Sequence, residues 1–388
     1  MGLRIAIFVS SLAGGGVARL SLTLAAGFAD RGHVVSVVTF DATAADFYEV
    51  PARVKRVQAS TGSRPLVRWF DLFGNIRRLA RIRAAITSTK PDCVISIADG
   101  TNELMLLATL GCRFERLVSV QIDQPAYDHH NTSWNDRRRR RFRRWAYRMA
   151  DAVVFLSPEQ SARAAADNPT WRCADVPNPV TPTIDTRLDK KAGSVIAQLK
   201  SREHWLVGTG RLVEQKGFDL LLPAFASLTA RFPAWGLLIL GEGPDRQALE
   251  RQAALLQIAD RVLMPGVAKL HAILQHCSVF VLSSRFEGQP LALMEAMLCG
   301  LPVVSFDCPS GPAAIIRPGV DGLLVRPITV EALSTELLKM MSCPDMRLRM
   351  GRAALDVRSR FDVELICAEW EKLIARCPLP QGCSNGGN

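Results

Sequence analysis

The 388-residue chain has no apolar run near the ~18 residues that would suggest a membrane span. Its first apolar run, residues 5–9, is short and soon meets three glycines, which favours a buried first strand over a signal peptide. No CxxC pair occurs among the ten cysteines, and the histidines do not stand at zinc-ligand intervals, so we expect no metal site. Scattered cysteines without a secretory signal are typical of reduced thiols in the cytosol.

What is present indicates a folded α/β protein. Apolar residues make up 48% and charged residues 22%, which fits a folded rather than a disordered chain, and the length suggests two domains. Apolar, β-branched runs alternate with helical patterns in both halves, which predicts two doubly wound parallel sheets. The expected strands lie at residues 4–10, 33–40, 93–98, 116–122, 152–157, 205–210, 236–243, 262–266, 278–284, 301–307 and 322–327. Residues 168–194, rich in Pro and Thr, are interpreted as a linker.

The positive charge lies almost wholly in the N-terminal half. Residues 1–180 hold 25 Lys+Arg against 16 Asp+Glu, out of a net charge of +11 for the chain. Two stretches, 68–86 and 137–150, combine arginines with aromatic or aliphatic residues at helical spacing. Three interpretations compete: ordinary core helices with a solvated basic face, binding to an anionic lipid surface, and nucleic-acid binding. We do not expect the chain to bind nucleic acid, because no recognition motif accompanies the charge.

Three motifs follow expected strands, where open α/β sheets bind their ligands. The glycine-rich "GGGVAR" (14–19) opens a helix but is not GxGxxG, so it supports a dinucleotide site only weakly. In "GTGRLVEQKG" (208–217), Arg211 and Lys216 precede a helix and form a suitable cradle for a diphosphate, unless both are exposed loop charges. In "FEGQPLALMEAM" (286–297), Glu287 stands in a turn and Glu295 in an expected helix. From the residues alone, a structural role explains each glutamate equally well. Glu287 would then be a charge at the helix N-terminus, and Glu295 a helix residue paired to a lysine or arginine.

Together these motifs resemble the GT4 family of retaining glycosyltransferases. "GRLVEQKGFDLLLPAFA" is similar to its GRL…KG motif, "FEGQPLALMEAMLCGLPVV" to its E-x7-E motif, and "GGGVARLSLTLA" to its GG-x-x-R loop. "VPNPV", "LLILGEGP" and "PGVDGLLV" also match in the expected order. The resemblance implies the GT-B fold, in which two Rossmann-like domains face each other across a cleft. We place an acceptor-binding domain at 1–180, joined by a C-terminal helix at 361–377, a donor domain at 181–360, and a disordered tail at 378–388.

The resemblance also implies roles for single residues. Arg211 and Lys216 would hold the donor's pyrophosphate and, with Glu287 near the donor sugar, carry the catalysis. Glu295 would accept hydrogen bonds from the ribose hydroxyls. The remaining donor contacts would be the backbone at Gly288, Gln289 and Pro290, and the loop glycines Gly15 and Gly16, which would let the N-terminal domain close on the phosphates.

The sequence departs from the family at one place. Many members carry a histidine after the strand that "LVSVQIDQP" matches, whereas the nearest positions here are Gln121 and Asp123. His129 and His130 follow and are candidates to replace it. Asp99, at the end of another expected strand, is a further candidate for a sugar or acceptor contact, although a strand-end Asp is as often a helix cap.

The implied activity is retaining, metal-independent hexosyl transfer from a nucleotide sugar, most commonly a UDP-sugar, to a hydroxyl. The nucleotide sugar is a co-substrate, and no cofactor is expected. We expect a lipid-linked saccharide acceptor in polysaccharide assembly and a cytoplasmic enzyme, peripheral on the inner face of the membrane. The alternatives are a soluble transferase acting on a small molecule, a sugar-nucleotide epimerase of the same fold, and a nucleotide-binding module without catalysis.

Overall fold

The computed structural model describes residues 2–13, 15–40, 48–59, 72–121, 134–180, 190–309 and 311–376, with only the backbone at 72–74. The described chain divides into two compact units. One comprises residues up to Pro179 together with those from Phe361 onward, and the other is Val180–Arg360. Each unit has its own parallel sheet and its own core.

The N-terminal unit contains a seven-stranded sheet in the order β3-β2-β1-β4-β5-β6-β7, in which all neighbouring strands pair in parallel. Its strands are β1 (Arg4–Val9), β2 (Val34–Thr39), β3 (Lys55–Gln58), β4 (Cys93–Ile97), β5 (Glu115–Ser119), β6 (Ala152–Phe155) and β7 (Cys173–Asp175). Its helices are α1 (Gly16–Asp30), α2 (Leu72–Ser88), α3 (Thr101–Ala108), α5 (Trp134–Ala146), the 3-10 turn η1 (Tyr147–Met149), α6 (Pro158–Asp167) and the C-terminal α16 (Val363–Arg376).

The C-terminal unit contains a six-stranded parallel sheet in the order β10-β9-β8-β11-β12-β13. Its strands are β8 (His204–Thr209), β9 (Trp235–Leu240), β10 (Val262–Gly266), β11 (Val279–Leu282), β12 (Val303–Phe306) and β13 (Gly322–Val325). Its helices are α7 (Lys190–Leu199), α8 (Phe218–Ala226), α9 (Arg246–Leu255), α10 (Leu270–Leu274), α11 (Leu291–Leu298), α12 (Pro312–Ile315), α13 (Val330–Ser342), α14 (Pro344–Ala354) and α15 (Val357–Arg360), with 3-10 turns η2 (Glu214–Lys216) and η3 (Ala259–Arg261).

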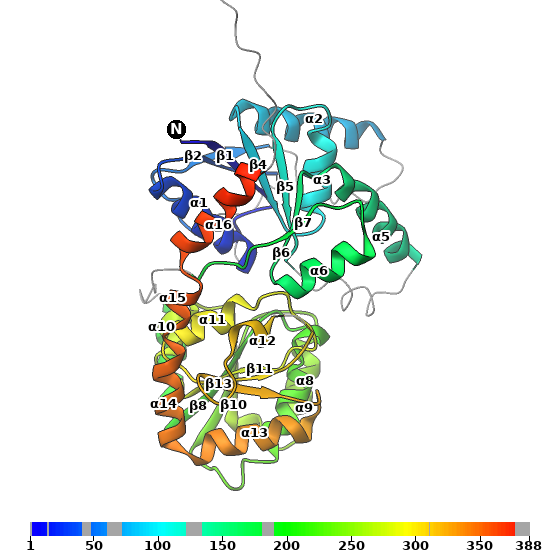
Figure 1. Cartoon of the computed structure of the whole chain (residues 1–388). Helices are drawn as coiled ribbons and strands as arrows, with labels where there is room; N and C mark the ends of the chain where they lie inside the picture. The colour runs from blue at the N-terminus through cyan, green and yellow to red at the C-terminus, as the bar shows by residue number, and fades with distance from the viewer. Residues whose placement is uncertain are drawn as a thin grey trace, which may run out of the picture. The chain divides into compact units, whose positions relative to one another are not determined.

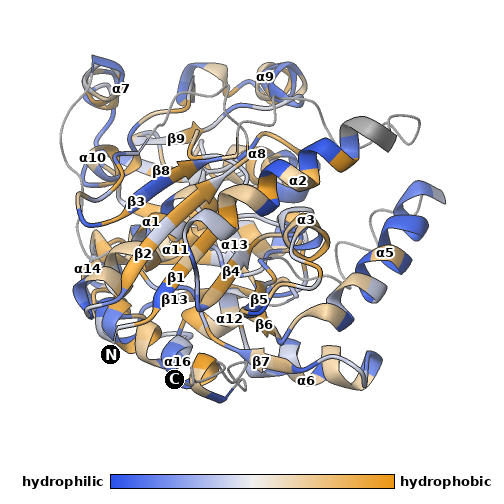
Figure 2. Cartoon of the chain, turned by 90° about the horizontal axis from the view of Figure 1, so that it is seen from above, coloured by the Kyte–Doolittle hydropathy of each residue, from blue (hydrophilic) through white to orange (hydrophobic). Residues whose placement is uncertain are grey.

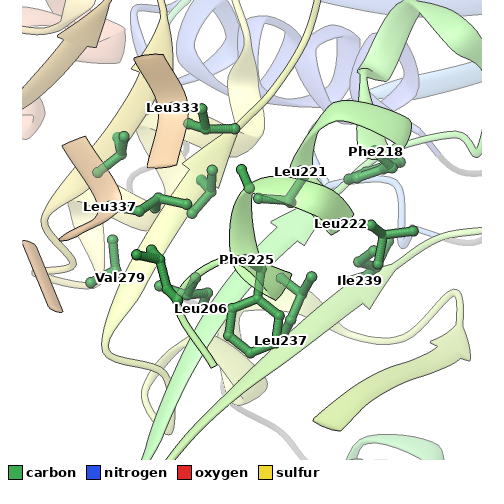
Figure 3. Close-up of a cluster of buried hydrophobic side chains, with 14 of the residues drawn as sticks. Leu206, Phe218, Leu221, Leu222, Phe225, Leu237, Ile239, Val279, Leu333 and Leu337 are labelled. Atoms are coloured by element: carbon green, nitrogen blue, oxygen red, sulfur yellow. The ribbon is translucent and has the colours of Figure 1, made fainter. Parts of the chain in front are cut away.

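Burial on both faces explains why the strands are continuous apolar runs. Every residue of β4, β9, β11 and β12 is buried, as expected for parallel strands covered by helices on each side. Figure 3 shows how Phe225 and Leu221 of α8 and Leu337 of α13 pack with strand residues in the C-terminal core. In Figure 2 the strands β1 and β2 are mainly in the hydrophobic colour.

The last described helix returns to the N-terminal unit. α16 packs against α1, and Figure 1 shows it in red beside the blue helix of the chain's start. A Cβ at Gly27 of α1 would lie 2.7 Å from both Cys367 Sγ and Val363 Cγ2, so the absence of a side chain there allows the two helices to approach closely.

All the strands expected from the sequence are present, but two edge strands were missed. β3 (KRVQ) and β7 (CAD) are short and only partly buried, so they lack the apolar run that identified the others. β7 pairs with β6 inside the segment 168–194, and α7 begins there, so the interpretation of that whole segment as a linker was wrong. The expected tail at 378–388 lies outside the described residues.

The eight cysteines among the described residues are free thiols. Over the same residues, no helix combines the length and the apolarity that crossing a bilayer requires.

Candidate functional site

The predicted donor-site residues come from loops at one edge of the C-terminal sheet. β8, β11 and β12 are neighbours in that sheet, and each ends in a loop that carries a polar side chain. Lys216 follows β8, Glu287 follows β11, and Cys308 follows β12. Parallel strands bring their carboxyl ends to the same edge, so residues 92 positions apart in the sequence converge here.

Glu287 and Lys216 form an ion pair. Lys216 Nζ lies 2.5 Å from Glu287 Oε1, and the side chains are 21% and 9% exposed. Ser284, which is buried, donates a second hydrogen bond to the same oxygen at 2.6 Å. No bond to Glu287 Oε2 is found among the described residues. One carboxylate oxygen is therefore fixed by the protein while the other is available to a ligand.

Close packing and further hydrogen bonds join the loops that carry this pair. Gly217 has a φ of +65°, and a Cβ there would lie 1.9 Å from the carbonyl oxygen of Ser283, so only glycine fits. Ser283 Oγ in turn donates to the Lys216 carbonyl at 2.8 Å. The Arg285 guanidinium binds both carboxylate oxygens of Asp219 at 2.8 and 2.6 Å, and this bidentate bond raises the pKa of Arg285. The position of Lys216 relative to Glu287 is thus set by bonds on both sides of the pair.

The two predicted phosphate-binding cations have different surroundings. Arg211 is exposed, and its side chain makes no hydrogen bond or ion pair with any described residue. Lys216 is partly buried and paired, so the alternative of two exposed loop charges applies to Arg211 alone. The first turn of α8, which follows Lys216, already carries the carboxylate of Asp219.

Glu295 lies on α11 and is buried among apolar neighbours. Only 8% of the residue is exposed, and the adjacent Met294 and Ala296 are fully buried. Its Oε2 lies 3.9 Å from Nε2 of the buried His271 on α10. Among the described residues, the ionisable group placed beside Glu295 is this histidine, whereas the alternative explanation from the sequence was a pair with lysine or arginine.

The turn between the two glutamates is tightly packed. Gly288, Gln289 and Pro290 are buried and lead into the N-terminus of α11. A Cβ at Gly311, before α12, would lie 2.3 Å from the carbonyl oxygen of Gly288, so the loop after β12 packs directly on this turn. No side chain caps α11, and Glu287 bonds to Lys216 and Ser284 rather than to the helix N-terminus.

Cys308, which follows β12, was not among the predicted site residues. This thiol is buried, and burial together with the negative charge of Glu287 raises its pKa to about 12. Cys308 is therefore a neutral side chain next to the ion pair. Its place directly after an apolar strand was the only signal that could have identified it.

The candidate residues of the N-terminal unit have mixed outcomes. Asp99 does not cap α3; it accepts a hydrogen bond from the Tyr147 hydroxyl at 2.6 Å and lies 3.8 Å from Arg143. Gln121 and Asn178 exchange two amide hydrogen bonds at 3.2 and 2.8 Å, which link the end of β5 to the segment after β7. The candidates Asp123, His129 and His130 lie outside the described residues.

The glycine loop opens α1 as the sequence predicted. Gly15 is the N-cap of the helix with a φ of +88°, and Gly16 is its first residue. Both glycines are exposed, and a Cβ at Gly15 would meet nothing within 4 Å, so the requirement for glycine there is conformational rather than steric.

The two basic stretches differ from each other. In α2, the buried residues Ile82 and Ile86 face the core, so its C-terminal half is an ordinary core helix. In α5 the aromatic residues are outside: Trp134 is 63% exposed, Phe142 38% and Trp145 48%. The side chains that α5 buries are Arg143 and Ala146. The core-helix interpretation of residues 137–150 therefore fails for Phe142 and Trp145 but holds for Ala146, which is buried, and for Met149, which packs against the core. Figure 2 shows α5 largely in the hydrophilic colour.

A pocket of about 430 Å³ lies at the other edge of the C-terminal sheet. Its lining includes His204 at the start of β8, Ser278 just before β11 and Pro302 just before β12. None of the predicted donor-site residues lines it. Because ligands of open α/β sheets bind at the carboxyl edge, we assign the candidate site to the Lys216–Glu287 pair and not to this pocket.

The described residues include no group of three or more His, Cys, Asp or Glu side chains that could hold a metal ion.

Comparison with known proteins divides the chain in the same way as the structure. A family model described as "Glycosyl transferase 4-like domain" matches residues 15–179, and one described as "Glycosyl transferases group 1" matches residues 193–357. The matches fall on the two sheets, one model to each.

Full-length relatives and solved structures agree with these models. The chain is 25% identical over 375 residues to an uncharacterized glycosyltransferase of Haemophilus influenzae, covering 96% of this chain and 99% of the relative. It is 26% identical over 375 residues (96% and 98%) to a Campylobacter jejuni N-acetyl-D-galactosaminyltransferase named for a saccharide–PP-undecaprenol substrate. Among structures, it is similar to sucrose-phosphate synthase of Thermosynechococcus elongatus (TM-score 0.78, 20% identity, 96% and 98% covered) and to Anabaena HepE in complex with UDP and glucose (0.75, 20%, 96% and 99%).

Proposed function

The chain belongs to the GT4-type glycosyltransferases with the GT-B fold, and from this premise we propose that it transfers a sugar from a UDP-sugar to a hydroxyl of a lipid-linked saccharide in polysaccharide assembly. The observation that carries the proposal is the Lys216–Glu287–Ser284 arrangement at the carboxyl edge of the C-terminal sheet. The UDP complex of HepE and the undecaprenol-linked substrate in the name of the Campylobacter relative support the choice of donor and acceptor.

The donor site would work mainly by electrostatics. The Lys216 ammonium has three N–H donors and gives one to Glu287, which leaves two for phosphate oxygens. The Arg211 guanidinium, which has no partner in the described segments, can bind the diphosphate with two parallel hydrogen bonds. Both charges would stabilise the diphosphate as it leaves, so we propose a metal-independent reaction.

The two glutamates would orient the donor. Glu287 Oε2 would accept a hydrogen bond from a hydroxyl of the sugar, while Oε1 keeps its hydrogen bonds from Lys216 and Ser284. Glu295, which lies near His271, would accept hydrogen bonds from the ribose hydroxyls. We propose retention at the anomeric carbon, with the acceptor hydroxyl attacking from the face that the diphosphate leaves.

The exposed face of α5 supports a peripheral membrane position. Trp134, Arg138, Phe142 and Trp145 recur at helical spacing, and the guanidinium of Arg138 lies over the Trp134 ring at 4.6 Å. Aromatic rings and arginines on one exposed helix face are the combination that binds the interface of an anionic bilayer. The acceptor would then be lipid-linked and reached at the membrane surface.

The donor proposal is tested by incubating the chain with UDP-, GDP- and ADP-sugars, with and without a bacterial lipid extract. We expect lipid-dependent release of UDP, reduced at least about a hundredfold in Glu287→Gln and Lys216→Ala. A new sugar nucleotide formed without lipid would instead identify an epimerase. Nucleotide binding without any turnover would identify a binding module.

The membrane proposal is tested by co-sedimentation with phosphatidylglycerol vesicles at low salt. We expect binding that weakens as salt rises and is lost in the triple variant W134A/F142A/W145A. Replacement of three exposed leucines elsewhere, L255A/L348A/L365A, is the matched control and should leave binding unchanged. No binding by the unmodified chain would favour a soluble transferase acting on a small acceptor.

A further inference from the structure

A buried polar cluster lies at the carboxyl edge of the N-terminal sheet, where β4 ends. The chain turns there through Ala98 (φ +79°) and Gly100 (φ +78°) and enters α3 at Thr101. Asn102 and Glu103, in the first turn of α3, are 0% and 8% exposed. The donor-site roles proposed above use neither of them.

Part of the cluster is satisfied by protein groups. The Asn102 amide nitrogen donates to the Ser119 carbonyl at 3.0 Å and to the Tyr147 hydroxyl at 3.1 Å. The Tyr147 hydroxyl donates in turn to Asp99 at 2.6 Å. These bonds hold α3, β5 and η1 together and fix the orientation of the Asn102 amide.

Two acceptor atoms on the first turn of α3 lack a hydrogen bond within the described part of the chain. They are Asn102 Oδ1 and Glu103 Oε1, and both are buried. More than nine-tenths of buried polar groups in folded proteins are paired, so two neighbouring exceptions on one helical turn need a cause. The carboxyl edge of an open α/β sheet is where such proteins bind ligands, and a ligand with hydroxyl groups would satisfy both atoms.

The charged groups around Glu103 come from two elements. Asp99 lies in the β4–α3 loop, and Arg139 and Arg143 face Glu103 from α5. Burial, followed by the negative charge of Asp99, raises the pKa of Glu103 to about 7 against the opposing effect of the arginines. At neutral pH a large share of the Glu103 carboxyl is therefore protonated and can both donate and accept a hydrogen bond, as a sugar hydroxyl does.

We propose that Glu103 and Asn102 form a hydroxyl-binding site for the acceptor saccharide in the N-terminal unit. The ligand class is a neutral polyol, and the contacts are hydrogen bonds from its hydroxyls to Asn102 Oδ1 and to the Glu103 carboxyl. The proposal rests on the proposed function, because it assigns the acceptor of that reaction. Glu103 acts here as a binding residue and takes no part in bond cleavage.

The chain contains a matched control for Glu103. Glu115, the first residue of β5, is 3% exposed and has a pKa raised by burial. Its Oε2 has no hydrogen-bond partner among the residues that the structure describes. It differs in lying at the amino edge of the same sheet, away from the edge that binds ligands. Substitution of Glu115 therefore reproduces the loss of a buried carboxyl without touching the proposed site.

The test uses the full chain and four probe acceptors, the octyl glycosides of glucose, galactose, N-acetylglucosamine and N-acetylgalactosamine. We expect Glu103→Ala to lower kcat/KM for the best glycoside about tenfold or more, mainly through KM, while the Kd of the nucleotide sugar changes less than about twofold. Glu103→Gln, which keeps a donor and an acceptor, should retain activity within about threefold at pH 7. Glu115→Ala should leave both quantities within about twofold.

Several results would overturn the site assignment. An unchanged acceptor kcat/KM in Glu103→Ala would do so, and so would an equal loss in Glu115→Ala, which would show a general effect of a lost buried carboxyl. If the chain binds a nucleotide sugar but transfers to none of the glycosides, the ligand class is wrong. If no nucleotide sugar binds, the proposed function fails. Calorimetric titration with the same glycosides then decides the Glu103 site separately, supporting it if Glu103→Ala weakens binding and overturning it if no glycoside binds.

Discussion

The two carboxylate oxygens of Glu287 have different surroundings. We therefore expect that replacing a residue that bonds to Oε1 will change the activity. Ser284→Ala removes one of the two hydrogen bonds to Oε1 and leaves Lys216 in place. A hydrogen bond to a charged group contributes roughly 1.5–3 kcal/mol, so we expect kcat to fall roughly tenfold to a hundredfold with little change in donor Kd. Ser283→Ala, which only loses a bond to a backbone carbonyl, is the comparison variant. An equal loss of kcat in both variants would contradict a specific role for Ser284.

His271 is buried and lies 3.9 Å from Glu295, so it can hold the Glu295 carboxylate in place. His271→Ala should raise the Kd of UDP about tenfold by releasing the Glu295 carboxylate from its position. The Kd of 2′,3′-dideoxy-UDP, which lacks the ribose hydroxyls, should not change. The exposed His276→Ala serves as control. Equal weakening of both nucleotides by His271→Ala would mean that the histidine acts on the fold rather than through Glu295.

The elements were predictable to the extent that each has a strong pattern of its own. The apolar runs identified the long strands, and the glycine loop and α8 start where the motifs predict. The pattern of α5 was misleading, because aromatic residues at helical spacing normally mark a buried face. Which face a helix turns to the core depends on its partners, and here the arginine Arg143 is buried while the tryptophans are exposed.

The docking of α16 on the N-terminal unit gives a prediction for pH dependence. Glu371 of α16 accepts two bonds from Arg31 at 2.7 Å and lies 2.8 Å from His33 Nε2, and the bond to Arg31 is the main cause that lowers its pKa to about 2. Because the pKa of Glu371 is lower in the folded than in the unfolded chain, its ionised carboxylate stabilises the fold at pH values above the unfolded pKa of about 4.5. This contribution is lost as the pH falls towards about 2.

Glu371→Gln should therefore lower the free energy of unfolding at pH 7, by about 1–2 kcal/mol once solvent screening of the partly exposed pair is allowed for. The difference from the unmodified chain should shrink as the pH falls from about 4.5 towards 2, as measured by urea unfolding. Glu369→Gln, which loses only an exposed pair with Lys372, should differ little at any pH. A pH-independent destabilisation by Glu371→Gln would show that packing, not charge, is responsible.

For the molecule as a whole, each unit has its own core, so a nucleotide that binds one unit should act on that unit's unfolding transition. A ligand at a hundred times its Kd adds about 2.7 kcal/mol, which corresponds to about 5–10 °C for a domain of this size. UDP should therefore raise the midpoint of the transition of the C-terminal unit. Arg211 has no partner among the described residues, so Arg211→Ala should leave the midpoint without ligand unchanged and reduce the shift with UDP. A lower midpoint without ligand would show a structural role, and an undiminished shift would remove Arg211 from the phosphate site.

The sequence by itself determined the two parallel sheets, the order of the motifs along them and the family, because hydrophobic periodicity and glycine-rich loops are local properties of a chain. The tertiary structure alone decided that Lys216 is held by Glu287 and that Glu295 has a histidine at its side. It also decided that Glu103 is buried with one oxygen that bonds to no described residue. Such facts depend on groups from distant segments meeting at one edge of a sheet. No local pattern records which side chain will face which, because burial and partner choice arise only when the elements pack.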